Sequence, residues 1–227
     1  MTRTLYSLCG ADAARPFSPH CWKIVMALRH KGLDFEERPL PFTAIPKIEG
    51  GISKTVPVLR DGQELISDSF QIALYLEEAY RDQPSLFGGE GGKALARFVE
   101  GYCQTLVHSV ITRIALSDIH SMLAPDDQAY FRASREARLG KTLEEIRASR
   151  DEAIALLPER LMPMRHMLAF QPFIGGETPL FADYILFGAL QWLRLTSGSL
   201  HLPADDVVAQ WFERCLDLYQ GAARAIA

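Results

Sequence analysis

Ser18 is the first residue whose type and position could do chemistry. It precedes Pro19 at the start of a predicted helix, where a serine is typically a cap. If the loop before this helix faces a bound thiol, the Ser18 hydroxyl could also donate a hydrogen bond to the thiolate, and the helix dipole would lower the thiol pKa. Because the thiolate is the attacking species, such a hydroxyl would raise the reactive fraction at neutral pH.

Two further motifs indicate a binding site for a small peptide. Pro57 interrupts an apolar run and removes a backbone donor, so the segment belongs at a sheet edge or a bend. A cis bond before Pro57 would turn the N–H and C=O of Val56 outward to pair with a peptide backbone. Asp68 and Ser69 open a predicted helix, where free N–H groups and the Ser69 hydroxyl could hold a carboxylate and Asp68 an amino group. An ordinary edge strand and an ordinary helix cap are the structural alternatives.

Other reactive side chains are less well placed. Cys21 lies on the apolar stripe of its helix, which favours a buried, inert thiol. Cys9, at the end of the preceding strand, is the rival thiol, and Tyr6, inside that strand, is the rival hydroxyl. We interpret His20 and Lys23, near the helix start, as solvated side chains.

The first eighty residues form the elements that position these groups. Gly62 follows an aspartate in a hairpin turn, and Gly32 is placed to end the first helix. The predicted order is strand 4–8, helix 19–31, strand 35–40, strands 57–60 and 64–66, and helix 69–79. This mixed sheet with packed helices predicts a thioredoxin-like domain.

The rest of the chain is predicted to be helical, after a linker rich in glycine and proline. We therefore expect an α/β domain at residues 1–82, a linker at 83–92 and an all-helical bundle domain at 93–227. Its predicted helices are 93–122, 126–139, 142–156, 179–195 and 206–219. Polar residues interrupt 179–195, so a buried core helix is favoured over a membrane span.

Composition narrows the possible functions. Hydrophobic residues make up 48% and charged residues 23% of the 227, which is typical of a globular protein. A net charge of −4 predicts no nucleic-acid-binding face. The four cysteines are scattered, so we expect neither a disulfide scaffold nor a metal site. With no apolar signal sequence at its start, the chain is expected in the cytoplasm and away from membranes.

In order and spacing, these motifs resemble those of the glutathione transferase family, over nearly the whole chain. Serine at position 18, rather than tyrosine or cysteine, is similar to the serine-type branch. The family usually has Ser, Thr or Asn where this chain has Leu180, so Thr178-Pro179 is the alternative cap of the core helix. The resemblance is carried by Ser18-Pro19, Val56-Pro57-Val58-Leu59, Asp68-Ser69 and Phe181-Ala182-Asp183-Tyr184.

A closer resemblance is to the bacterial β-aryl-etherase-like glutathione transferases. In those enzymes the glutathione thiolate attacks the ether-bearing carbon of an aromatic substrate and displaces a phenol. The chain is expected to lack the long C-terminal extension of some members. The residues that carry this resemblance are Ser18-Pro19-His20-Cys21-Trp22-Lys23, Phe42-Thr43-Ala44-Ile45, Ser134-Arg135-Glu136 and Asp217-Leu218-Tyr219-Gln220-Gly221.

The resemblance implies a role for each motif. Ser18 would stabilise the thiolate, Val56 would pair with the glutathione backbone with Pro57 holding it, and Asp68 and Ser69 would hold the γ-glutamyl end. It also implies a cytoplasmic homodimer that detoxifies an apolar, aromatic electrophile. The electrophile pocket would lie between the domains, lined by residues 9–17 and 93–122, with Phe17, Tyr102 and His108 as candidates.

Two other functions remain open from the sequence. A glutathione-dependent thiol-disulfide reductase would need a nucleophilic cysteine where the chain has Ser18, so Cys9 or Cys21 would have to substitute. A non-catalytic protein that binds glutathione or another ligand would use Ser18 as a cap alone.

Overall fold

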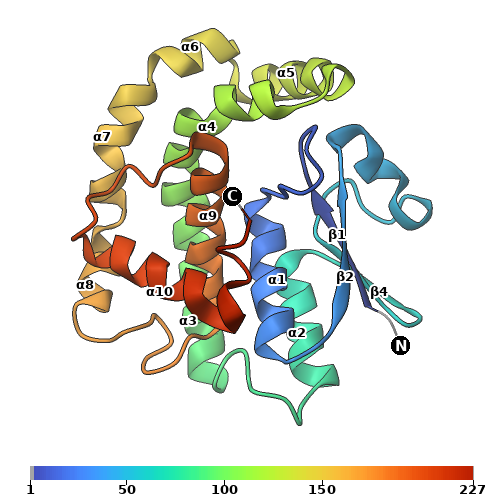
Figure 1. Cartoon of the computed structure of the whole chain (residues 1–227), viewed down its shortest axis with the longest axis vertical. Coiled ribbons are helices and arrows are strands. Elements are labelled where there is room, and N and C mark those ends of the chain that lie inside the picture. Colours follow the sequence, from blue (N-terminus) through green and yellow to red (C-terminus); the bar gives the residue numbers. More distant parts are fainter. Residues whose placement is uncertain (1–2, 227) are drawn as a thin grey trace.

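A four-stranded sheet forms one side of the molecule and helices form the rest (Figure 1). The structure is a computed structural model that describes residues 3–226. The strand order is β2-β1-β3-β4, with β1 and β2 parallel and the other neighbouring pairs antiparallel. The strands are β1 (Arg3–Leu8), β2 (Phe35–Leu40), β3 (Val58–Asp61) and β4 (Glu64–Ser67).

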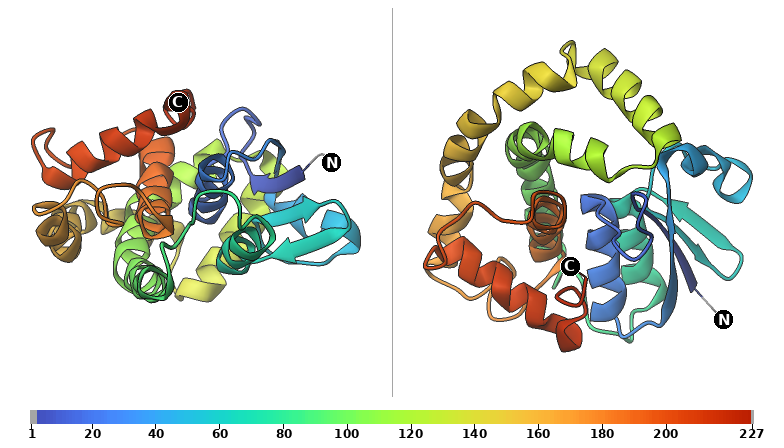
Figure 2. Two further views of the ribbon diagram at one scale, coloured as in Figure 1. Left: turned by 90° about the horizontal axis from the view of Figure 1, so that it is seen from below. Right: turned by 45° about the horizontal axis from the view of Figure 1, so that its top comes forward.

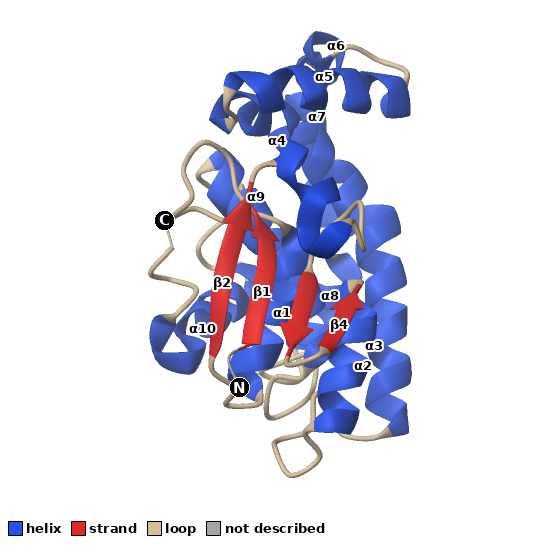
Figure 3. Ribbon diagram, turned by 90° about the vertical axis from the view of Figure 1, so that its right-hand side faces the viewer, coloured by secondary structure: helices blue, strands red, loops and turns tan. Residues whose placement is uncertain are grey.

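Helices α1 (Pro19–His30) and α2 (Ser69–Ala79) lie behind the sheet when it faces the viewer (Figure 3). Leu5 in β1 and Leu59 in β3 are fully buried between the strands and these helices. The predicted thioredoxin-like domain is therefore confirmed. The element between β2 and β3, a 3-10 helix η1 (Phe42–Gly50), was not predicted.

The second half of the chain is helical, as predicted (Figure 2). The helices are α3 (Glu90–Tyr102), the π-helical turn η2 (Cys103–Val107), α4 (His108–Met122), α5 (Pro125–Leu139), α6 (Leu143–Ala148), α7 (Arg150–Arg160), α8 (Met162–Leu168), α9 (Phe181–Ser197) and α10 (Val207–Gly221). None of the helices in residues 3–226 is long and apolar enough to cross a membrane.

Three helical predictions need correction. The predicted helix 93–122 contains the π turn η2, and α8 was not predicted. The predicted helix 142–156 is broken at Ser149, whose hydroxyl donates to the carbonyl of Ile146 at 2.8 Å and so competes with regular helical bonding. Since α3 begins at Glu90, inside the predicted linker, the domain boundaries stay predictions.

The core helix α9 is buried along most of its length. Asp183 closes its first turn by accepting from the N–H of Leu180 at 3.0 Å, which is half of a capping box, because Leu180 has no side-chain acceptor. Thr178-Pro179 precedes this cap position, so the prediction that it caps the helix is wrong. The other donors to Asp183 are the N–H groups of Ile174 and Gly175 and the indole of Trp211.

Helix α9 also fixes the start of α1. A Cβ at Gly188 would lie 2.3 Å from the carbonyl oxygen of Pro19, so only glycine allows this approach. The contact joins the helical half directly to the residue that follows Ser18. The position of Ser18 therefore depends on α9 as well as on its own helix.

Candidate active site

A cavity of about 450 Å³ lies where the two halves meet at the start of α1. The sheet-containing half and the helical half both contribute side chains to it. Among the residues that line it are Phe17, Ser18 and Val56 from the first half, and His108, Arg135 and Trp192 from the second. A cavity of this size is in the range of small-molecule sites.

Ser18 both caps α1 and lines this cavity. Its Oγ accepts from the N–H of Cys21 at 3.4 Å, and the residue is 4% exposed. A hydroxyl whose oxygen accepts still has its O–H to donate. Because the N-terminus of α1 also carries a partial positive charge, a thiolate placed here would be stabilised by both.

The predicted cis bond between Val56 and Pro57 is present. Val56 lines the cavity, and neither its N–H nor its C=O has a hydrogen-bond partner within residues 3–226. Both groups are thus free to pair with a peptide backbone, as at the edge of a sheet.

Asp68 and Ser69 are at the start of α2, but neither is among the residues that line the cavity. Oδ1 of Asp68 accepts from the N–H groups of Phe70 and Gln71, at 2.9 and 3.0 Å. Oδ2 of Asp68 has no partner in the described part of the chain. The helix start is therefore capped, and one carboxylate oxygen remains for a ligand.

Lys23 of α1 connects the start of α2 to the helical half. The interpretation of Lys23 as a solvated side chain is therefore wrong. Lys23 is fully buried, with Nζ 3.3 Å from Oε1 of Glu100 and 3.5 Å from Oγ of Ser69. Burial lowers the pKa of Lys23, and the charge of Glu100 opposes that shift. The sequence did not reveal this placement because α9 packs along α1 and Glu100 of α3 reaches its polar side.

Of the three candidate pocket residues, Phe17 and His108 line the cavity and Tyr102 does not. The Tyr102 hydroxyl donates to the carbonyl oxygen of Arg160, at the end of α7. The predicted pocket role of Tyr102 is therefore corrected, because its side chain packs between helices of the second half.

His20 also lines the cavity, so its interpretation as solvated is wrong. Its ring centroid lies 5.4 Å from that of His108, which lies 5.6 Å from that of Trp192. Burial lowers the pKa of His20 well below its usual value and that of His108 to about 3, so both rings are neutral at neutral pH. Nε2 of His108 is buried without a partner in residues 3–226.

The rivals of Ser18 are not available for the same chemistry. Burial raises the pKa of Cys9 to about 11 and that of Cys21 to about 12, and neither lines the cavity. The hydroxyl of Tyr6 donates to Glu49. In residues 3–226 no three His, Cys, Asp or Glu side chains are grouped as a metal site.

Comparisons with known proteins agree with this geometry. Two family models match the chain: "Glutathione S-transferase, N-terminal domain" over residues 13–84 and "Glutathione S-transferase, C-terminal domain" over residues 94–218. A glutathione S-transferase-like protein of Aspergillus flavus is 25% identical over 79% of this chain and 75% of its own length.

Two solved structures are similar over almost the whole chain. A glutathione transferase of Phanerochaete chrysosporium is 26% identical, with a TM-score of 0.76 over 99% of this chain and 94% of that one. A glutathione S-transferase of Ceriporiopsis subvermispora, in complex with glutathione, is 20% identical, with a TM-score of 0.77 over 99% and 96%. The second likeness concerns the fold alone.

Proposed function

The chain belongs to the glutathione S-transferase family, and from that premise we propose that it transfers glutathione to an apolar, aromatic electrophile held in the cavity. Glutathione is the co-substrate. Its thiolate sulfur forms a bond to the electrophilic carbon, and the leaving group departs with the electron pair of the bond that breaks. The thiol proton passes to solvent.

The observation that carries this proposal is the position of Ser18, at a helix N-terminus that faces the cavity. Its hydroxyl donates to the glutathione sulfur and lowers the thiol pKa. The unpaired N–H and C=O of Val56, held by Pro57, pair with the backbone of glutathione. Ser69 and the start of α2 hold the γ-glutamyl carboxylate, and Oδ2 of Asp68 accepts from the α-amino group.

Aryl ethers are the specific class of electrophile that the β-etherase-like resemblance adds to this proposal. The same attack on an ether-bearing carbon would release a phenolate, which takes a proton from solvent. Phe17, Phe42 and Trp192 line the cavity and provide aromatic surface for such a substrate.

We also propose that the protein is a homodimer with a detoxifying role in the cytoplasm. The four cysteines are free thiols, as expected for a reducing compartment. On α3 the side chain of Phe98 is 67% exposed, which suits a contact with a second copy.

The test is the pair of variants Ser18→Ala and Ser18→Thr. The alanine variant removes the hydroxyl and should lower kcat for aromatic electrophiles by about a hundredfold, the size of losing one preorganised donor. It should also raise the pKa of the bound glutathione thiol, followed by ultraviolet thiolate absorbance. The threonine variant keeps a hydroxyl and an N-cap, so most of the activity should remain.

Three outcomes would contradict the proposal in different ways. If Ser18→Ala binds glutathione and conjugates several electrophiles at the wild-type rate, the serine mechanism fails. If glutathione gives the wild-type protein no thermal stabilisation, the binding site itself is misassigned. Wild-type protein that is stabilised by glutathione but turns over no electrophile would be a non-catalytic binding protein.

A further inference from the structure

The cavity is lined by positive charge, two of its three cations being on α5. Lys54, Arg135 and Arg138 line it, and none of its lining residues is an aspartate or glutamate. An apolar, neutral substrate would leave these cations without an opposite charge. The charge composition of the cavity thus bears on which electrophile it takes.

Arg135 is the best defined of these cations. Its guanidinium lies over the rings of Phe42 and Phe131, 5.2 and 4.7 Å from their centroids. Nη1 donates to Oγ of Ser134 at 3.0 Å, and no carboxylate in residues 3–226 pairs with it. The aromatic rings hold the guanidinium in place, while most of its five N–H donors stay free.

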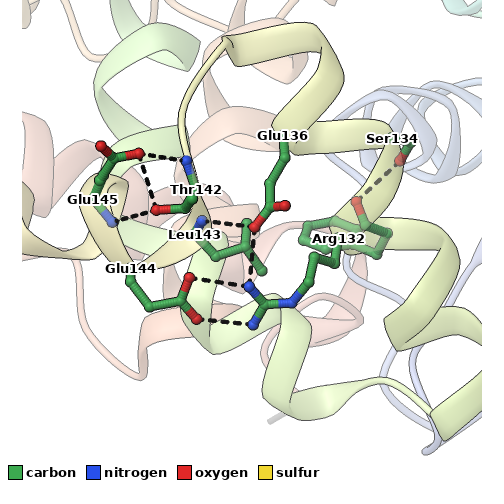
Figure 4. Close-up of polar contacts among 8 residues, drawn as sticks. Arg132, Ser134, Glu136, Thr142, Leu143, Glu144 and Glu145 are labelled. Carbon is green, nitrogen blue, oxygen red and sulfur yellow. Dashed lines mark hydrogen bonds and ion pairs between the residues drawn. The ribbon is translucent and has the colours of Figure 1, made fainter.

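The neighbouring arginine on the same helix is a clear contrast. Arg132 forms ion pairs with Glu136 and with Glu144, at 2.9 Å each (Figure 4). Arg138 lines the cavity like Arg135 and also has no carboxylate partner in the described part of the chain. Helix α5 therefore has one arginine paired with carboxylates and two at the cavity that are not, of which Arg135 is partly buried and Arg138 is exposed.

An unpaired guanidinium that is half-buried costs free energy unless an anion reaches it. The planar fork of arginine fits a carboxylate with two parallel hydrogen bonds. The surroundings of Arg135 also favour an anion. Burial and the charge of Arg138 both lower the pKa of Arg135, and the negative charge of a bound anion would oppose this lowering.

We propose that the preferred electrophile carries a carboxylate, which Arg135 and Arg138 bind while its reacting carbon faces Ser18. This inference rests on the proposed transferase function and narrows its substrate class to electrophiles whose aromatic, apolar body carries one carboxylate. The glycyl carboxylate of glutathione itself is the other source of an anion. Lys54 lies two residues before Val56, on the glutathione side, so it is the nearer cation for that group.

The experiment compares two electrophiles that share one reacting carbon, 4-chloro-3,5-dinitrobenzoate and its methyl ester. In Arg135→Gln and in Arg138→Gln, kcat/KM for the benzoate should fall by about tenfold or more, the loss of one charge-assisted contact. For the ester kcat/KM should fall less, so the ratio of kcat/KM for the benzoate to that for the ester should drop in both variants. Arg132→Gln removes the same charge from α5 and should leave the ratio of the two substrates unchanged.

A second arm assigns the anion. With the ester as electrophile, KM is measured for glutathione and for its glycyl ethyl ester. If Arg135→Gln raises KM for glutathione but not for the glycyl ester, the arginines bind glutathione and the inference is overturned. The glutathione conjugates of both electrophiles are also used as inhibitors. The ratio of their inhibition constants compares carboxylate and ester binding without turnover.

Failure of this inference is distinct from failure of the proposed function. An unchanged benzoate-to-ester ratio in both variants, with normal turnover of the ester, overturns the anionic substrate class and leaves the transferase in place. Loss of glutathione stabilisation and of all conjugation in the wild-type protein overturns the proposed function instead.

Discussion

Three polar residues at helix starts organise the site and its support. Ser18, Asp68 and Asp183 each accept from backbone N–H groups at the first turn of α1, α2 and α9, respectively. Of the three, only Ser18 lines the cavity. The same type of local bond therefore serves packing in the core and chemistry at the cavity, and the surrounding elements decide which.

Glu49 provides a prediction for stability against pH. It accepts from Nε of Arg60 at 2.7 Å and from the hydroxyl of Tyr6, which ties the end of η1 to the sheet. These bonds hold the pKa of Glu49 at about 2. Since this is below the usual value of about 4.3, the carboxylate stabilises the fold above that pH, and the contribution is lost as pH falls toward 2.

Glu49→Gln should therefore lower the free energy of unfolding near pH 7 by about 1 kcal/mol, a value limited by partial exposure. The difference from wild type should shrink as pH falls from about 5 to about 2.5, measured by thermal unfolding. Glu64→Gln, which removes an exposed carboxylate with no ion pair in residues 3–226, is the control and should have little effect. A stability difference between wild type and Glu49→Gln that stays constant over this pH range would contradict the lowered pKa of Glu49.

At the level of elements, sequence periodicity predicted the helices and strands that have one regular apolar face. Helix α2 was predicted over residues 69–79 and has these bounds. The 3-10 helix η1 was missed because Pro46 lies inside it and Glu49 and Gly50 have positive φ angles, 48° and 75°. No regular apolar repeat survives such a backbone.

Irregular backbone also explains why Tyr102 was wrongly predicted as a pocket residue. Tyr102 and His108 were treated as parts of one regular helix, but the π turn η2 lies between them. Because a π turn changes the rotation of the following helix, a face assigned with a period of 3.6 does not carry across it. Arg135 was missed as a pocket residue because its contact with Phe42 joins positions far apart in the sequence, which no local motif reports.

Gly188 provides a prediction for the contact between α1 and α9. Helix propensity alone predicts that Gly188→Ala stabilises the protein by up to about 1 kcal/mol. The clash with the carbonyl of Pro19 predicts the opposite, a loss of about 1–3 kcal/mol from overpacking, and a displaced Ser18 with lower kcat. Denaturant unfolding and conjugation rates distinguish the two, and Gly188→Val should be worse than alanine on both measures.

At the scale of the whole molecule, the cavity depends on both halves of the chain. The sheet-containing half supplies Ser18 and Val56, and the helical half supplies His108, Arg135 and Trp192. The first set comes from local motifs that sequence alone could find. The second set depends on how the helices pack against the first domain. Of it, the sequence named only His108, and Arg135 and Trp192 could be assigned to the cavity only with the structure.

The proposed homodimer is a property of the whole molecule, and a substitution at Phe98 tests it. In a two-fold dimer the same surface meets itself, so an exposed Phe98 would be buried on both copies, at about 1.5–3 kcal/mol for each side chain. Phe98→Glu would instead place two like charges close together in a desolvated contact. Light scattering should therefore report a dimer for the wild type and a single chain of 25.4 kDa for this variant.

Phe170→Glu is the control, because Phe170 is 79% exposed and lies just beyond α8, not on α3. It removes another exposed phenylalanine and adds the same charge, so it should leave the dimer intact. If both variants dissociate, the effect is one of net charge and not of the α3 surface. If Phe98→Glu stays dimeric and Phe170→Glu does not, the interface includes the segment after α8 and not the surface of α3 that carries Phe98.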